Sequence, residues 1–198
     1  MLQYIISGSN SAEIIVTAKA ALENACQWIR LDVSLLPASE QDKTVDIVGQ
    51  SCKRFDAILT IENDVEAVKR LKLAGLHLVD KSISAVDARN EMGEEPIIGV
   101  TINSSSEVPF VPRAAVDYIE IDKSVDDIKV QSEIVEQIKS SGRDEPVIAH
   151  YGCIPSLSLL RASGVNGVSL DNSSSSAAEL KDLIHKLELL VEERLSTL

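Results

Sequence analysis

Short apolar runs alternate along the chain with longer segments in which apolar residues recur every three or four positions. Eight runs bounded by polar or turn-forming residues predict β-strands, at Leu2–Ser7, Trp28–Val33, Ala57–Ile61, Gly75–Val79, Ile97–Ile102, Asp117–Ile121, Pro146–His150 and Gly167–Leu170. Helical stripes between them comprise Ile14, Ala18, Ala21, Leu22 and Ala25, then Val65, Val68 and Leu71, then Ile128, Ile134, Val135 and Ile138. Strands that alternate with helices predict parallel βαβ units.

The number of strand–helix units sets the expected architecture. Eight units in 198 residues leave about 25 residues for each, enough for a short strand, a three-turn helix and tight loops. We therefore expect one α/β domain, a single (β/α)8 TIM barrel spanning residues 1–198. A doubly wound open sheet is the alternative, but the first strand-to-helix turn, Ser7–Ser11, lacks the GxGxxG pattern. No linker rich in proline or glycine divides the chain.

The final predicted helix, from Ser176 to Leu195, carries the clearest apolar face. Its members are Leu180, Leu183, Ile184, Leu187, Leu190 and Val191. Packing onto the barrel wall accounts for most of this face. A stripe that continues past the barrel edge can also join two subunits, so we expect a homodimer.

Composition narrows the possible partners and compartment. The chain has 19 Lys and Arg against 31 Asp and Glu, a formal net charge of −12, and 3% aromatic residues, so nucleic acid is not an expected partner. No apolar run approaches the ~18–20 residues of a membrane span, and no basic segment precedes an apolar stretch at the start of the chain. We expect neither a membrane partner nor a secreted precursor. Cys26, Cys52 and Cys153 lack metal-binding spacing, which favours a reducing, cytoplasmic compartment.

Charged residues gather at the predicted C-terminal strand ends, where a (β/α)8 barrel carries its reaction site. The acidic ones are Asp32, Glu62, Asp64, Asp80, Glu120, Asp122 and Asp171, and the basic or titratable ones are Arg30, Lys81, Lys123 and His150. Carboxylates this close raise one another's pKa values or recruit a cation such as Mg2+. For each residue, a solvated loop position or a helix cap is the alternative interpretation.

Short motifs in a recognisable order run along nearly the whole chain. They read GLHL at 75–78 followed by Asp80, IGVT at 98–101, DYI at 117–119, PVIA at 146–149, GCI at 152–154 and GVNGV at 164–168. In order and spacing they resemble the stretches GVHLGQ, IGVS, DYI, PVVAIGGI and GADGVAV of the thiamin phosphate synthase family. The resemblance implies a small barrel that joins a pyrimidine pyrophosphate to a thiazole phosphate with Mg2+. A phosphorylated small-molecule ligand is therefore expected.

The resemblance and the strand-end positions together give three groups of candidate site residues. The candidate catalytic residues are Arg30, Asp32, Thr101 and His150; the candidate substrate-binding residues are Asn63, Asn103, Gly152, Cys153, Asn172 and Ser173; the candidate Mg2+ ligands are Asp64 and Asp80. Two carboxylates with diphosphate oxygens suit Mg2+. Gly152, Cys153 and the amides of residues 172–174 are expected to cradle a phosphate.

Each candidate also has a structural interpretation. Asp64 is well placed to be the N-cap of a helix that starts at Val65, a role that does not exclude metal ligation. Thr101 suits a strand by propensity alone. His150 can be a buried histidine bonded to a backbone carbonyl, and His77, in mid-strand between leucines, is expected to serve packing.

Departures from the family's motifs lower the coupling activity that we expect. Asp32 and Ser34 stand where the synthases present Arg and Lys, and the sixth-strand signature GPVF becomes Glu120-Ile121-Asp122-Lys123 with no Thr-x-Thr-Lys after it. A sister branch of thiazole tautomerases shares the barrel, but its catalytic histidine aligns with Asn103. Because departure of pyrophosphate needs positive charge, we expect a degenerate site with weak coupling activity. The alternative is a non-catalytic barrel that acts as a ligand-binding or partner module.

Overall fold

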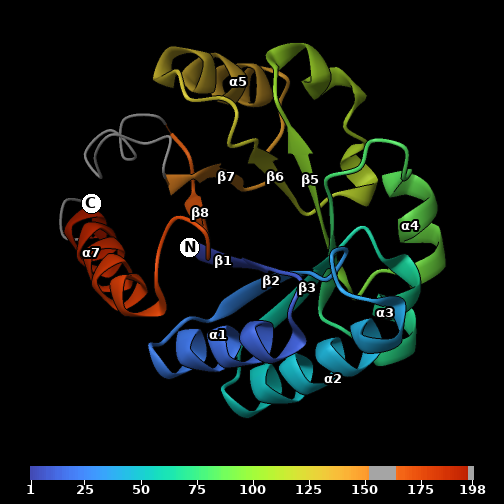
Figure 1. The fold of residues 1–198 in the computed structure, drawn as a ribbon. Helices are drawn as coiled ribbons and strands as arrows, with labels where there is room; N and C mark the ends of the chain where they lie inside the picture. The colour runs from blue at the N-terminus through green and yellow to red at the C-terminus, as the bar shows by residue number, and fades with distance from the viewer. Residues whose placement is uncertain (152–163, 196–198) are drawn as a thin grey trace. The chain divides into compact units, whose positions relative to one another are not determined.

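The computed structural model describes residues 1–151 and 164–195 and contains a closed parallel barrel. Within these residues eight strands follow one another around the barrel in chain order (Figure 1): β1 (Leu2–Ser7), β2 (Trp28–Asp32), β3 (Ile58–Glu62), β4 (Gly75–Leu78), β5 (Ile97–Ile102), β6 (Tyr118–Ile121), β7 (Val147–His150) and β8 (Gly167–Asp171). Each predicted strand is present, and its ends differ from the prediction by at most one residue. The TIM-barrel prediction is confirmed.

The described helices alternate with the strands at most positions. They are α1 (Ser11–Glu23), α2 (Ala38–Arg54), α3 (Val65–Leu71), α4 (Ala85–Met92), α5 (Ile128–Ser140) and α7 (Ala177–Leu195). Ala25 was wrongly included in the helical stripe predicted for this segment. The helix α1 ends at Glu23, and Ala25 has a left-handed φ of 68°. None of the described helices combines the length and apolar character that crossing a membrane requires.

Between β5 and β6 the chain forms two short 3-10 helices, η1 (Ser105–Phe110) and η2 (Arg113–Ala115), in place of an α-helix. Pro109 lies inside η1, and Pro112 immediately precedes η2. Proline has no backbone N–H to donate and disfavours helical backbone at the preceding residue, so a regular helix cannot run through this segment.

One compact unit comprises Met1–Ile58 and Leu170–Leu198. In it β1 pairs with β2 in parallel, and α1 packs against both α2 and α7. The N-cap residue Asn10 accepts hydrogen bonds from the backbone N–H groups of Ala12 and Glu13, which fixes the start of α1. At the start of α7, Ser176 and Glu179 form a reciprocal capping box.

The apolar face of α7 is buried in its first turns. Leu180 is fully buried and Leu183 is 5% exposed, as packing onto the barrel wall predicts, whereas Leu189 is 46% exposed. The side chains of Leu190 and Val191 lie outside the described set. The homodimer stays a prediction.

The other compact unit comprises Leu59–Ser169. Here α3 and α4 lie side by side and α5 packs against η1. The buried Arg89 of α4 forms hydrogen bonds with several chain segments. Its guanidinium donates to the carbonyls of Gly93 and Pro96, and its Nη2 lies 2.5 Å from Asp117 Oδ2. Asp117 Oδ2 also accepts the Ile98 N–H at 2.7 Å, so one carboxylate joins α4 to the starts of β5 and β6.

Candidate functional site

A buried polar network occupies adjacent strands of the Leu59–Ser169 unit. The register places Gly99 of β5 beside His77 on β4 and beside Tyr118 on β6. A Cβ atom at Gly99 would overlap the Tyr118 ring. Because Gly99 has no side chain, the ring crosses β5, and the Tyr118 hydroxyl lies 2.6 Å from His77 Nδ1.

The other imidazole nitrogen faces two oxygens. His77 Nε2 lies 2.7 Å from Thr101 Oγ1 and 3.1 Å from Glu120 Oε2, and the Thr101 hydroxyl donates to the same Glu120 oxygen at 3.2 Å. His77, Tyr118 and Glu120 are each at most 4% exposed, whereas Thr101 is half-buried. Thr101 is therefore the most exposed of these four residues.

This network corrects the prediction for His77. The side chain is buried as expected, but it makes polar contacts with three residues instead of serving packing alone. The sequence contained one usable signal, because Thr101 and Glu120 are polar residues within otherwise apolar strands. A polar residue on each of three consecutive parallel strands indicates a shared interior cluster.

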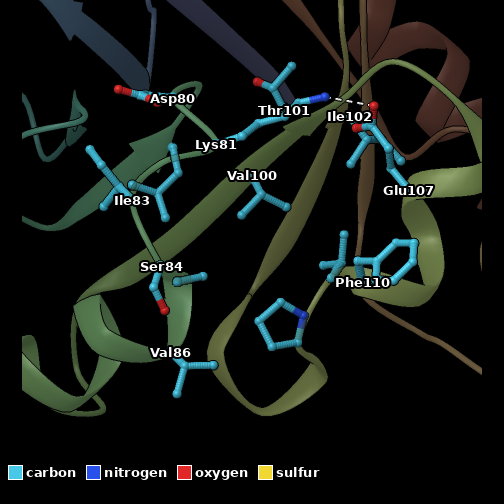
Figure 2. Close-up of a pocket in the computed structure, with 14 residues that line it drawn as sticks. Asp80, Lys81, Ile83, Ser84, Val86, Val100, Thr101, Ile102, Glu107 and Phe110 are labelled. Carbon is cyan, nitrogen blue, oxygen red and sulfur yellow. Dashed lines mark hydrogen bonds and ion pairs between the residues drawn. The ribbon is translucent and has the colours of Figure 1, made fainter.

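A pocket of about 470 Å³ lies beside the C-terminal ends of β4 and β5, and Thr101 is among the residues that line it. Figure 2 shows the apolar side chains of Ile83, Val86 and Val100 along the lining, with the Lys81–Glu107 ion pair above them in this view; its Nζ–Oε1 distance is 2.6 Å. Phe110, also on the lining, is 85% exposed. Such a lining suits a small ligand with an apolar body and a polar end.

Asn63 fixes the loop that begins this pocket. It has a left-handed φ of 55°, a conformation that asparagine tolerates, and its backbone N–H donates to the His77 carbonyl at 3.0 Å. Its Oδ1 accepts the backbone N–H groups of Val79 and Asp80 at 2.9 and 3.0 Å. The predicted substrate-binding residue thus ties the end of β3 to the loop after β4.

The two predicted metal ligands follow these same strand ends. Asp64 is the N-cap of α3, with Oδ1 accepting the Ala67 N–H at 2.8 Å, as its position predicted. Asp80 is exposed, and hydrogen bonds from Ser82 hold the pKa of its carboxyl below the usual value, so it is an anion at neutral pH. Across the described residues no cluster of three or more metal-ligating side chains occurs. Mg2+ commonly takes only one or two carboxylates with water and substrate phosphates, so the carboxylates of Asp64 and Asp80 are of the ligand type that it prefers, and their role stays a prediction.

Two predicted catalytic residues belong to the other unit. Arg30 of β2 is 5% exposed, and its Nη1 donates to Gln3 Oε1 at 3.0 Å. Asp32 ends the same strand, and its Oδ1 accepts the Ser34 N–H at 2.9 Å. The acidic residue therefore closes a turn at the position where the family resemblance places arginine.

The loop after β8 is held by its own carboxylate. Asp171 Oδ1 accepts the backbone N–H groups of Ser173 and Ser174 at 3.1 and 2.9 Å and the Ser173 hydroxyl at 2.5 Å. The Asn172 side chain bonds both backbone groups of Ser7, at 3.1 and 3.0 Å. The polar groups expected to cradle a phosphate here are thus engaged within the protein.

The remaining predicted site residues lie at other strand ends. Asn103 follows β5, is exposed, and donates its backbone N–H to Glu107 Oε2 at 3.4 Å. His150 ends β7 and is 7% exposed. Gly152 and Cys153 lie outside the described residues.

Comparison with known proteins identifies the family to which the chain belongs. The family model for thiamine monophosphate synthase matches residues 3–172. The chain is 28% identical over 205 residues to the thiamine-phosphate synthase of Bacteroides thetaiotaomicron, covering 96% of this chain and 98% of that protein. It is also 28% identical over 184 residues to the Bacteroides fragilis thiamine-phosphate synthase, covering 87% and 90%.

A solved structure has the same fold. The thiamine phosphate pyrophosphorylase from Pyrococcus furiosus superposes with a TM-score of 0.75 at 17% identity, covering 93% of each chain. Because the family model spans most of the sequence, the resemblance predicted from the motifs is confirmed: the chain belongs to the thiamine monophosphate synthase family.

Proposed function

We propose that this barrel binds the phosphorylated precursors of thiamin phosphate with Mg2+ and joins a pyrimidine pyrophosphate to a thiazole phosphate only weakly. Family membership supports the reaction class. The main support for reduced activity is the position of Asp32. This carboxylate lies at the end of β2 and accepts the Ser34 N–H at 2.9 Å. The family resemblance has Arg and Lys at these two positions.

The charge of these residues matters because negative charge develops on the departing pyrophosphate. Positive side chains aimed at those oxygens lower the barrier, and a carboxylate in their place raises it. Lys81 lines the 470 Å³ pocket of the Leu59–Ser169 unit, but its ammonium lies 2.6 Å from Glu107, which offsets its charge. The described pocket therefore offers little net positive charge to a diphosphate.

A bound Mg2+ would supply part of the missing positive charge to the diphosphate oxygens. Asp64 and Asp80 are the residues that would hold it. Asn63 contributes indirectly, since its side chain bonds the backbone N–H of Asp80 and sets the start of that loop. The hydrogen bond from Ser82 keeps Asp80 ionised, as a hard oxygen ligand must be.

A second candidate function, ligand binding without turnover, draws support from the loop after β8. Ser173 and Ser174 direct their N–H groups to the Asp171 carboxylate. A phosphate at the same amides would have to displace that carboxylate and would meet its negative charge. A substrate phosphate would therefore bind these amides poorly, which favours a binding or partner module over an efficient synthase.

The test restores the basic pair. The D32R/S34K variant and the wild type are incubated with hydroxymethylpyrimidine pyrophosphate, thiazole phosphate and Mg2+, and thiamin phosphate is measured. We expect the variant to couple at least about tenfold faster, the gain from one good charged contact. Leu35→Lys, which adds a positive charge to the exposed neighbouring position, is the matched control and should give no gain. Mg2+-dependent pyrophosphate binding with no coupling in any variant would favour the binding module.

A further inference from the structure

The 470 Å³ pocket is backed by the outer side of the barrel wall. Side chains alternate between the two faces of a strand, so Leu78 and Val100 point away from the face that carries the His77 network. Leu78 and Val100 are partners in the register, and both line the pocket together with Val86 of the surrounding helix α4. The main wall of the pocket is therefore the outer face of β4 and β5, opposite the buried network.

An incomplete outer layer explains why this space is open. In a (β/α)8 barrel the helix that follows each strand covers the outer face of the sheet. The chain between β5 and β6 instead forms η1 and η2, in which Pro109 lies within η1 and Pro112 precedes η2. Val100 is consequently half-buried, whereas Ile98, two residues earlier on the same face of β5, is fully buried. The outer face of β5 thus lacks the helix that the strand–helix alternation would place between β5 and β6.

Phe110 borders the pocket but does not fill it. Its side chain is 85% exposed, more than any other large apolar side chain that the structure describes, and it is one of two phenylalanines in the sequence. Figure 2 shows Val100 between Ile83 and the Phe110 ring. Val86, on the same lining, is 46% exposed. Exposed apolar side chains gathered around a pocket mark an interaction surface, and an aromatic ring seated in a pocket is a frequent anchor of protein interfaces.

The rim of the pocket carries both signs of charge. Asp80 and Lys81 are neighbours there, and both are exposed. Lys81 is bonded to Glu107 of its own chain, but its side chain is 57% exposed, which leaves it able to face a second carboxylate. A surface with one sign of charge repels a copy of itself, whereas this rim can pair Lys81 of one copy with Asp80 of another. The face is therefore complementary to itself in charge.

We propose that a second copy of this chain covers the pocket in a two-fold symmetric contact, in which the Phe110 ring of each copy enters the pocket of the other. Such a contact uses the same patch on both copies, so the patch must supply a projecting group and the hollow that receives it. Phe110 and the pocket beside it meet that requirement within one compact unit, Leu59–Ser169. The contact also removes Val86 and Val100 from water, which stabilises the dimer.

The first test is the oligomeric state. Sedimentation velocity across micromolar concentrations compares the wild type with Phe110→Ser and Val86→Lys, and we expect the wild type to approach twice the chain mass of 21.4 kDa. Each variant should raise the dissociation constant about 30-fold or more, the effect of removing an interface anchor. Both substitutions are at exposed positions, so the variants should fold, which melting curves check. Val16→Ser removes a 67% exposed apolar side chain from α1, in the other unit, and should dimerise as the wild type does.

The second test asks whether the ring of one copy reaches the pocket of the other. The photoreactive amino acid p-benzoylphenylalanine replaces Phe110 and keeps an aromatic ring at this position. After irradiation we expect a covalent dimer on a denaturing gel, with the cross-link mapped by mass spectrometry to Ile83, Val86 or Val100, which line the pocket. The same amino acid at Val16 is the control and should give no covalent dimer.

Three results would overturn the inference. A wild type that sediments as a monomer at every concentration would leave the pocket to a small ligand or to a different protein. A dimer that survives Phe110→Ser and Val86→Lys but is lost in Leu189→Ser would place the interface on α7, where Leu189 is 46% exposed. Cross-links from position 110 only to surfaces away from the pocket would show that the two copies meet elsewhere.

Discussion

His77 Nε2 lies 3.1 Å from Glu120 Oε2, although β5 separates their strands β4 and β6. Gly99 of β5 presents no side chain between His77 and Tyr118, its neighbours in the register, and this leaves room for the Tyr118 hydroxyl to reach His77 Nδ1. A residue with no functional group of its own thus makes room for the network.

Gly99→Ala should disrupt this arrangement. The added methyl group overlaps the Tyr118 ring, so the ring must move and its hydrogen bond to His77 is lost. We expect the free energy of unfolding to fall by about 1–3 kcal/mol, as for overpacked cores, in urea denaturation. Gly8→Ala is the control, since a Cβ there meets Ile14 Cγ1 at an ordinary 3.7 Å. Equal stability of the two variants would contradict the account.

Arg89→Ala should destabilise the Leu59–Ser169 unit. The substitution removes a buried guanidinium that bonds Asp117 and the carbonyls of Gly93 and Pro96. Loss of the Arg89 donor from these three acceptors should cost about 2–3 kcal/mol, measured by urea denaturation. Lys19→Ala breaks only an exposed i,i+4 pair and should change the free energy of unfolding by less than about 0.5 kcal/mol.

Asn63→Ala should weaken Mg2+–pyrophosphate binding without abolishing the fold. It removes the acceptor of the Val79 and Asp80 N–H groups and places alanine at a φ of 55°. Calorimetry should show affinity reduced about 5-fold or more, because the Asp80 loop loses its anchor. Asn63→Asp keeps an acceptor oxygen and should retain most of the affinity. Wild-type affinity in Asn63→Ala would show that this anchor has no part in binding.

The buried thiols predict a specific pH dependence. Burial raises the pKa of Cys26 to about 11 and that of Cys52 to about 12, from a usual value of 9.0. Both stay protonated in the fold while the unfolded chain ionises, so stability should fall as pH rises above about 9. In a Cys153→Ser variant neither thiol should react with a thiol reagent at pH 8 until urea is added. Rapid reaction of the folded variant would contradict this burial.

The predictions that the structure confirms rest on patterns among residues close together in the sequence. The strands were found because their apolar runs are bounded by turn-forming residues, and the N-cap at Asp64 because capping involves residues within one helical turn. The η1–η2 segment departs from the strand–helix alternation because its prolines interrupt helical hydrogen bonding.

Non-local contacts account for what was missed. His77 was assigned to packing because its partners Thr101 and Glu120 come from two other strands. The side chain of Asn172 bonds Ser7, which is 165 residues away in the sequence. Polar residues on neighbouring strands were a signal for the His77 cluster, but no periodicity or spacing predicts the pair formed by Asn172 and Ser7, which arises only once the barrel closes.

The coupling rate of the wild-type protein tests the central claim most directly. The purified chain is incubated with hydroxymethylpyrimidine pyrophosphate, thiazole phosphate and Mg2+, and thiamin phosphate formation is followed over time. With Asp32 and Ser34 in place of two basic residues, we predict turnover several orders of magnitude below ordinary enzyme rates, or none. Turnover of about 1–10 per second would contradict the account, because other residues would then supply the missing positive charge.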